Sequence, residues 1–358
     1  CTDCIGCTNL RNQKYCIFNK QYSKEEYQKI KSDYNLGSWS GYEKLKNESE
    51  NFWMSQSPKP AYDDMSQDST GSYVFQSKNC KECYDVSDCE DCKFLLMMYR
   101  KPQKNCYDVS AFGYAIENAY ECGAIFEFVT NVKFSQESGI HLLNAEYCKQ
   151  SLGGQDHFGC VSVRKGNYVI FNKEYSKKEY QNLREKIIAH MDEMPYTDKA
   201  GNIYKYGEFF PMEFSPLPYN KTFANLFFPK TDEEIKSFGG WVLGEEEKTY
   251  AITKKSSEIP DNIREVGNDI LNEVFECEQC HKGYKVIEME FDFLKKNSLP
   301  LPHKCPFCRI NEKLMLWVDN MTLKDRTCDK CSKEFRTHYS KERAPVIYCK
   351  ECYLKEYY

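Results

Sequence analysis

The sequence predicts a mainly β protein with α-helical caps, in which a β-solenoid of short coils is followed by a small cysteine-rich C-terminal module. Three observations lead to this fold class. They are a long internal repeat, a series of short strand-like segments at regular spacing, and four C-x2-C pairs near the C-terminus. Internal repetition constrains an architecture more strongly than local propensity does, so it defines the first expected elements.

One stretch occurs twice, at Gly6–Ile30 and at Gly159–Leu183, with a constant offset of 153 residues and 14 identities over 25 positions. Each copy contains a short strand and then a serine, Ser23 or Ser176, with a glutamate three positions later. This spacing is a capping box and predicts the start of a helix. We expect two copies of a longer unit. Because the sequence lacks an initial Met, we also expect a missing N-terminal part that held the rest of the first copy.

Short segments with strand composition recur between Tyr73 and Ile170, roughly every 13 residues. The pentapeptide Cys-Tyr-Asp-Val-Ser occurs at Cys83–Ser87 and again at Cys106–Ser110. Further segments lie near Tyr120–Phe126, Val132–Phe134, Ala145–Cys148 and Cys160–Val163. This spacing suits a solenoid whose coils of roughly 25 residues contain two strands each. The cysteines would stack inside it as small hydrophobic residues, and the repeated stretch would supply the last coil and a helix over the open edge.

The remaining elements follow from composition shifts along the chain. Helices are expected at Tyr42–Met54, at Lys177–Met191 and from Pro260–Asp261 to Phe275. The expected domains are 1–34, the end of a first truncated solenoid unit with its cap helix; 35–72, a helical linker; 73–194, a solenoid unit with its cap helix; 195–260, an irregular aromatic and proline-rich connector; and 261–358, a double metal-binding module.

Composition argues against two classes of protein, those that coat nucleic acid and those with a membrane-spanning helix. A net charge of -5 argues against a protein that coats nucleic acid, and no apolar run approaches the roughly 18 residues of a membrane helix. Many of the 20 cysteines form C-x2-C pairs, which suit metal ligation in a reducing compartment better than disulfide bonding. We therefore expect a cytoplasmic protein, with export left open because the N-terminus is expected to be missing.

Four C-x2-C pairs lie close to the C-terminus: Cys277/Cys280, Cys305/Cys308, Cys328/Cys331 and Cys349/Cys352. Two residues between thiolates let a tight turn aim both sulfurs at one ion, and two such turns supply the S4 shell that Zn²⁺ favours. The sequence therefore predicts two structural zinc ions held by these eight cysteines. Sequential pairing is the simplest arrangement, although an interleaved one would use the same residues.

The residues next to these pairs indicate which secondary-structure elements hold them. The first pair of each foursome precedes a hairpin-like segment, and the second pair, as at Cys305-Pro and Cys349-Lys, starts a helix. A knuckle, a hairpin and a helix-borne pair resemble the treble clef and zinc ribbon. Cys277–His281 also matches the haem c attachment pattern, but the partner pair downstream favours zinc and makes His281 a surface residue.

A third zinc site is an alternative for Cys80, Cys83, Cys89 and Cys92, although a buried ladder is favoured for these four. Cys1, Cys4 and Cys7 have the same spacing, and their role is left open.

No catalytic or cofactor-binding motif stands out, which makes an enzyme the less favoured class. Asp85, Asp88 and Asp108 would matter in a solenoid-groove enzyme acting on polysaccharide or nucleic acid, but Asp is also a common turn residue. His141 and His157 have no recognisable catalytic partner. Ten basic residues of the C-terminal region could form a nucleic-acid face, although glutamates are interleaved with them: Lys304, Arg309, Lys313, Lys324, Arg326, Lys330, Lys333, Arg336, Lys341 and Arg343.

Several phrases resemble an uncharacterised family of cysteine-rich, zinc-ribbon proteins from the ultra-small bacteria of the candidate phyla radiation. These phrases are Asn9–Tyr27, Gly207-Glu-Phe-Phe-Pro, Ile259-Pro-Asp-Asn-Ile and Val346-Ile-Tyr-Cys-Lys-Glu-Cys-Tyr, and the resemblance covers nearly the whole chain. It implies a zinc-ribbon segment and solenoid coils ahead of this sequence, and it implies no particular activity. His281 stands where the family tends to have Gly.

The sequence as a whole predicts a non-enzymatic zinc-binding protein. Its solenoid would serve as a scaffold, and its double zinc module would bind protein or nucleic acid. The partner and the oligomeric state are left open.

Overall fold

The computed structural model describes residues 1–98, 103–113, 116–125, 129–244 and 250–358. The chain divides into two compact units, one formed by Cys1–Pro60 with Glu245–Tyr358 and the other by Ala61–Gly244. The described residues hold eight α-helices beside the strands, so the protein is mixed α/β and not mainly β as the sequence predicted. The domain boundaries expected from composition stay predictions, and the joining of the two chain ends in one unit was not among them.

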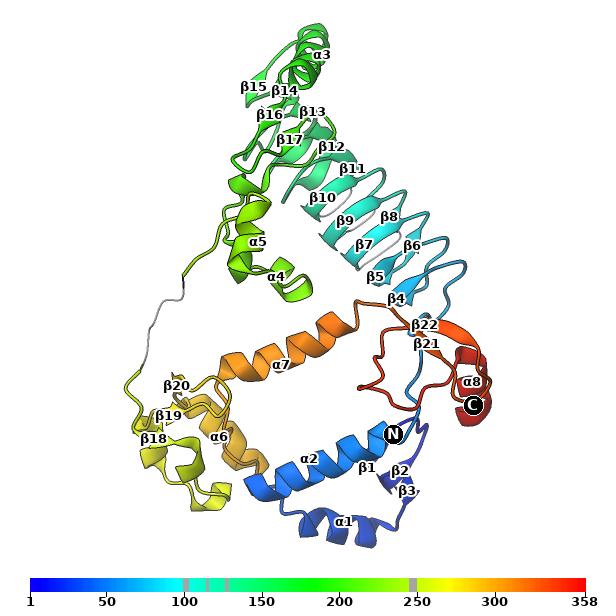
Figure 1. Ribbon diagram of the computed structural model, residues 1–358, viewed down its shortest axis with the longest axis vertical. Helices are drawn as coiled ribbons and strands as arrows, with labels where there is room; N and C mark the ends of the chain where they lie inside the picture. Colours follow the sequence, from blue (N-terminus) through cyan, green and yellow to red (C-terminus); the bar gives the residue numbers. More distant parts are fainter. Residues whose placement is uncertain (99–102, 114–115, 126–128, 245–249) are drawn as a thin grey trace. The chain divides into compact units, whose positions relative to one another are not determined.

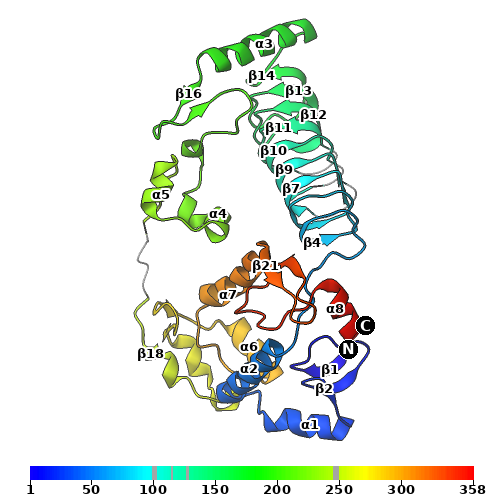
Figure 2. The ribbon, with the colours of Figure 1, turned by 45° about the vertical axis from the view of Figure 1, so that its right-hand side comes forward.

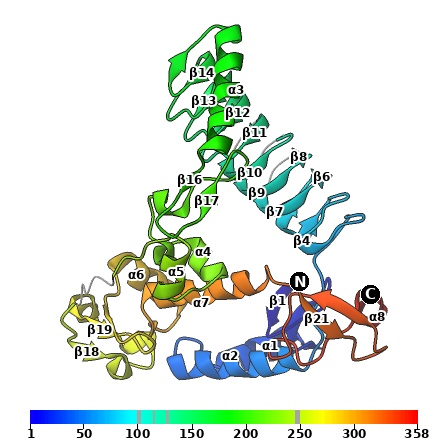
Figure 3. The ribbon, with the colours of Figure 1, turned by 45° about the horizontal axis from the view of Figure 1, so that its top comes forward.

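In the described part of unit Ala61–Gly244, ten strands form one large sheet, and those from β4 to β14 lie side by side in chain order (Figures 1 and 3). All pairs from β4 to β14 are parallel, and β15 closes the sheet antiparallel to β14. The strands are β4 (Gly71–Phe75), β5 (Cys83–Ser87), β7 (Lys93–Met98), β9 (Tyr107–Phe112), β10 (Tyr120–Ile125), β11 (Thr130–Lys133), β12 (Gly139–Glu146), β13 (Leu152–Phe158), β14 (Asn167–Ile170) and β15 (Lys173–Glu174). A second short parallel pair joins β6 (Cys89–Glu90) to β8 (Gln103–Lys104).

The repeat is half as long as the sequence suggested. Gly71 pairs with Cys83, 12 positions on, and Lys93 pairs with Tyr107, 14 positions on. Each repeat therefore contributes one strand to the large sheet, and the expected two-strand coil of roughly 25 residues is wrong. Phe126, which was included in one expected strand, lies outside the described residues.

A three-residue rhythm explains this shorter repeat. Every third side chain from Cys80 to Met98 is buried: Cys80, Cys83, Val86, Cys89, Cys92, Leu95 and Met98. The residue before each of them has a positive φ between 51° and 57°: Asn79, Glu82, Asp85, Asp88, Asp91, Phe94 and Met97. A left-handed residue turns the backbone sharply. Four such steps make 12 residues, which returns the chain beside its previous strand. Each non-glycine residue in this conformation costs about 1–2 kcal/mol, which burial and the strand hydrogen bonds offset.

The two copies of the repeated stretch form the same elements. In the first copy β2 (Lys14–Ile17) is followed by β3 (Lys20–Gln21) and α1 (Lys24–Asp33), and in the second β14 is followed by β15 and α3 (Lys177–Glu193). Ser23 and Ser176 both form capping boxes at the helix starts. Gly6 and Gly159 have φ near 60°, and a Cβ there would lie within 2.5 Å of a phenylalanine ring. The matching sequence therefore specifies matching turns.

Helix α3 packs at the β14 end of the large sheet (Figure 2). Its Tyr180 is buried with Phe158 and Ile170, and Ile187 and Met191 pack around that cluster. The segment after α3 contains short elements: β16 (Tyr196–Thr197), β17 (Ile203–Tyr204), α4 (Phe223–Phe227) and α5 (Asp232–Ser237). No helix in the described ranges combines the length and apolar character that crossing a bilayer requires.

The other unit brings the two ends of the chain together. Strand β1 (Thr2–Ile5) pairs with β2, and α2 (Trp39–Met54) begins three residues before the helix expected there because Ser38 caps it. The C-terminal part contains β18 (Lys254–Lys255), β19 (Phe275–Glu276), β20 (Gly283–Tyr284), α6 (Glu288–Asn297), α7 (Pro306–Asp319), β21 (Lys324–Thr327), β22 (Glu334–Thr337) and α8 (Lys350–Tyr357).

The helix expected from Pro260 to Phe275 is wrong. Two short 3-10 turns, Ile263–Glu265 and Asn268–Asn272, occupy this segment. Gly267 between them is extended, with φ -83° and ψ 172°, which interrupts any helix. Ile263, Val266 and Ile270 still pack in one core, so their helix-like spacing reflects burial of successive turns.

Candidate metal centres

The first cysteine foursome is assembled by a hairpin and a helix start. Cys277 and Cys280 lie in the turn between β19 and β20, which pair antiparallel. Cys305 is the N-cap residue of α7, and Cys308 lies in the first turn of that helix. The backbone N–H of Cys305 donates to Cys277 Sγ at 3.2 Å, which ties the helix start to the hairpin.

The second foursome repeats this plan. Cys328 and Cys331 lie in the turn between the antiparallel strands β21 and β22. Cys349 is the N-cap residue of α8, and its backbone N–H donates to Cys328 Sγ at 3.1 Å. Cys352 follows in the first helical turn. Both foursomes thus join consecutive pairs, which is the sequential arrangement.

The sulfur atoms converge as a tetrahedral metal shell requires. In each foursome all four Sγ atoms lie within 4.8 Å of one another. Cys280 Sγ lies 3.8 Å from Cys305 Sγ, and Cys331 Sγ lies 3.7 Å from Cys349 Sγ. A tetrahedron of metal–sulfur bonds of about 2.3 Å places its sulfurs about 3.8 Å apart. The eight cysteines could therefore hold two metal ions.

In each site the backbone favours the thiolate form of one cysteine, whereas burial raises the pKa of Cys280 and Cys308 in the first site and of Cys349 in the second. Burial raises the pKa of Cys277, but N–H groups of Cys280, Cys305 and Gln279 outweigh it and lower that pKa to about 6. The pKa of Cys328 falls to about 6 for the same reasons, with burial opposed by the backbone N–H groups of Cys349, Lys330 and Cys331. A thiolate is the form of cysteine that ligates metal.

The residue that follows each C-x2-C turn has an unusual backbone conformation, and at the first turn this residue is His281. His281 and Ser332 follow the second cysteine of their turns, and both have positive φ, 58° and 57°. Glycine adopts this conformation most easily, so a glycine at position 281 would also fit this turn. His281 is largely exposed and its Nδ1 lies 3.1 Å from Glu276 Oε1, which makes it a surface residue.

Both modules are anchored on the first 60 residues of the same unit. Next to the first foursome, the Trp39 ring stacks on His303 with centroids 4.0 Å apart, and the Ile263 N–H donates to Gly37 O. Next to the second, Tyr353 OH donates to Asn9 Oδ1 at 2.8 Å, and the N–H of Tyr348 donates to Ser57 Oγ. These contacts were not predicted, because no local motif signals a pairing between residues about 230 to 340 positions apart.

The cysteines of the large sheet have a different role. Cys80, Cys83, Cys89 and Cys92 belong to its hydrophobic core and are at most 3% exposed. In the described ranges, the two C-terminal foursomes are the sets whose donor atoms converge as a metal site requires. The C-x2-C spacing in the sheet comes from the three-residue rhythm, because inward positions recur at every third residue. Cys4 and Cys7 have the same rhythm, with positive φ at Asp3 and Gly6.

The acids and histidines considered for catalysis occupy structural positions. Asp85 in β5, Asp108 in β9 and Asp88 after β5 all have positive φ, between 56° and 57°, at left-handed steps where the backbone turns sharply. His157 is fully buried, and its Nε2 lies 3.1 Å from Gly166 O. His141 is exposed on β12. This arrangement favours the turn interpretation of the aspartates.

The basic residues of the C-terminal region are largely neutralised. Six of the ten contact carboxylates: Lys304 with Glu312, Arg309 with Glu290, Lys324 and Arg343 with Asp319, Lys330 with Glu356, and Lys333 with Glu351. Arg326 donates to the carbonyl oxygens of Tyr339 and Ala344. A cationic side chain that already has a carboxylate partner contributes little attraction to phosphate.

In comparisons with known proteins, no family model, no curated protein and no solved structure matches the chain.

Proposed function

We propose that the chain is a non-enzymatic zinc-binding scaffold protein, in which two Zn²⁺ ions stabilise the C-terminal modules. The observation that carries this proposal is the convergence of eight cysteine sulfurs in two sets with tetrahedral spacing. Four thiolates complete the preferred shell of zinc and leave no position for substrate, which is typical of a structural site.

Zinc has a physical task in these modules. Strands β19 and β20 have two residues each, and the core beside the first foursome includes Cys277 and Cys305 themselves. So small a core gives little stability alone, and binding of a structural zinc supplies apparent free energies of about 10–16 kcal/mol. The knuckle, the hairpin and the helix-borne second pair support a treble-clef or zinc-ribbon classification for both modules.

The large sheet is proposed to be a β-solenoid closed by α3. Its support is the one-strand repeat of parallel strands, the buried side chain at every third residue, and the packing of α3 beside β14. A covered edge cannot pair with another chain, so α3 would prevent end-to-end association. In the described part of the large sheet, no group of three or more Asp, Glu, His or Cys side chains converges as a metal site requires.

The partner is proposed to be a protein and not nucleic acid, because most basic side chains of the zinc modules already contact carboxylates. The resemblance to cysteine-rich zinc-ribbon proteins supports the proposed architecture and implies no particular activity. Free thiolate ligands require a reducing compartment, so a cytoplasmic location is part of the proposal.

Native mass spectrometry of the full chain tests the metal proposal. We expect two zinc ions per chain, and disulfides between the pairs or a metal-free protein would refute it.

Nucleic-acid binding at low and moderate salt tests the partner. We expect no affinity at low salt, and a binding constant that falls steeply as salt rises would contradict the protein-partner proposal.

A further inference from the structure

The unit Ala61–Gly244 contains a concave apolar pocket of about 700 Å³ beside α3. Three segments enclose it. The first is a column of side chains across successive repeats, where Gln136, Lys149 and Val161 follow one another through parallel bridges. The second is α3, with Ile187 and Met191, and the third is the segment 209–216. The volume lies within the range of small-molecule sites, about 300–1,000 Å³.

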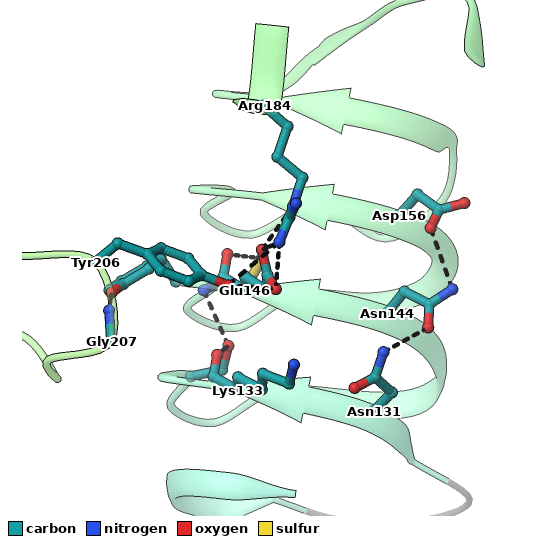
Figure 4. Close-up of polar contacts among 11 residues, drawn as sticks. Asn131, Lys133, Asn144, Glu146, Asp156, Arg184, Tyr206 and Gly207 are labelled. Atoms are coloured by element: carbon teal, nitrogen blue, oxygen red, sulfur yellow. Dashed lines mark hydrogen bonds and ion pairs between the residues drawn. The ribbon is translucent and has the colours of Figure 1, made fainter. Parts of the chain in front are cut away.

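The third wall is held in place by a partly buried ion pair (Figure 4). Arg184 of α3 donates from Nε and Nη2 to the two carboxylate oxygens of Glu146, each at 2.8 Å. Tyr206 OH donates to Glu146 Oε1 at 3.0 Å, and the Gly207 N–H donates to Tyr147 OH at 2.9 Å. These bonds fix the chain just before Phe209 and Phe210. The pocket is therefore preformed, which reduces the entropic cost of binding.

The lining has a distinct charge pattern. Most of it is aromatic or aliphatic, and several of its rings stand in solvent, such as Phe171 at 65% and Phe214 at 59% exposed. Its ionisable cationic groups are Lys149 and His190, and no Asp or Glu lines it. Among the described residues neither Lys149 nor His190 forms a recorded ion pair. An apolar pocket with a cationic rim complements an apolar molecule that carries an anionic group.

We propose that this pocket binds a small anionic amphiphile, such as a medium-chain carboxylate. The hydrocarbon part packs against the aromatic side chains of the segment 209–216 and against α3, and the carboxylate accepts a hydrogen bond from the Lys149 ammonium. This site is separate from the zinc modules and does not depend on their metal.

Calorimetric titration of the full zinc-loaded chain tests this proposal with three probes of equal chain length: dodecanoate, dodecanol and dodecyltrimethylammonium. We expect one dodecanoate per chain, bound about tenfold or more tightly than the cationic probe, because a charge-assisted hydrogen bond contributes about 1.5–3 kcal/mol. Equal affinity for dodecanoate and the cationic probe, or no binding of dodecanoate, would overturn it.

Three variants locate the site. Lys149→Gln should lower dodecanoate affinity about tenfold and leave dodecanol affinity unchanged. Val161→Trp, at a half-exposed position of the lining, should fill the pocket and weaken both probes. Lys173→Gln makes the same charge change on β15 outside the pocket and should have no effect. Unchanged far-UV circular dichroism and urea midpoints verify folding. Dodecanoate binding that survives Val161→Trp, or falls equally with Lys173→Gln, would refute the assignment.

Discussion

Cysteine pairs of identical spacing have opposite roles in the two units. In the large sheet, Cys80 and Cys83 are buried hydrophobic residues of a repeat. In the C-terminal part, Cys277 and Cys280 converge with a helix-borne pair in a set that could hold a metal ion. The spacing of two residues is the same, because both a tight knuckle and a three-residue repeat return a side chain to one direction after three positions. The spacing alone therefore does not distinguish the two roles.

The flanking residues do distinguish them. Around Cys80 and Cys83 the buried series continues at Val86, Leu95 and Met98, so the cysteines are members of a longer row of inward side chains. In each C-terminal foursome the first pair instead lies in the turn of a short hairpin, and the second pair lies at a helix N-terminus. The two kinds of pair can be distinguished by looking for hydrophobic residues three, six or more positions from each cysteine, in steps of three. Such residues flank the pairs of the sheet.

Metal removal should give the largest difference between the units. With a strong chelator, amides of β21 and β22 should lose most of their protection from hydrogen exchange, because the zinc contributes about 10–16 kcal/mol to such modules. Amides of β9 to β13 should exchange as before. Hydrogen-exchange mass spectrometry measures both, and equal loss of protection in the two units would mean that the sheet cysteines also hold metal.

Two matched cysteine-to-serine substitutions test the metal-binding role in the C-terminal part and the core-packing role in the sheet. Cys305→Ser should reduce the zinc content from two ions to one, since a hydroxyl is a poor zinc ligand. Cys83→Ser should keep both ions and destabilise the sheet by about 1–3 kcal/mol, because it buries a polar group in an apolar core. Native mass spectrometry and urea unfolding report these outcomes. Loss of zinc from Cys83→Ser would place a third metal site in the sheet.

Substitution of the two capping serines compares how much the helix cap stabilises each copy of the repeated stretch. Ser176→Ala should destabilise the end of the large sheet by about 1 kcal/mol, because the first turn of α3 loses its side-chain acceptor. Ser23→Ala should have a similar effect on α1. Urea unfolding followed by hydrogen exchange of each helix measures the two effects. A neutral Ser176→Ala would show that packing, and not the cap, fixes α3.

The smallest expected effect is a pH dependence confined to the sheet. Burial lowers the pKa of His157, and the hydrogen bond to Gly166 only partly opposes it. The unfolded chain, with a histidine pKa of about 6.5, therefore takes up the proton first as the pH falls. The contribution of neutral His157 is complete above about pH 6.5 and is lost progressively below it.

His157→Leu should reduce the fall in urea midpoint of the sheet between about pH 7.5 and about pH 5.5. His190→Leu, at an exposed position of α3, should leave it unchanged. An identical fall in the His157→Leu protein would assign the dependence to other groups.

Much of this architecture follows from local sequence. The capping boxes at Ser23 and Ser176 and the helix-borne pairs at Cys305 and Cys349 are short-range patterns, because the atoms that interact lie within a few residues of one another. The repeated stretch is read by comparing two such local patterns along the chain. The eight cysteines that converge in two sets in the structure were singled out by the same kind of local spacing.

Tertiary structure decided what local patterns leave open. The one-strand repeat depends on left-handed residues such as Phe94 and Met97, whose side chains carry no such preference; the neighbouring strands impose that conformation. The segment from Pro260 to Phe275 has helical spacing, yet the core around Ile263 and Ile270 is satisfied by short turns. The partly buried hydrogen bond from Arg184 to Glu146 joins residues 38 positions apart, and only the packed fold brings them together.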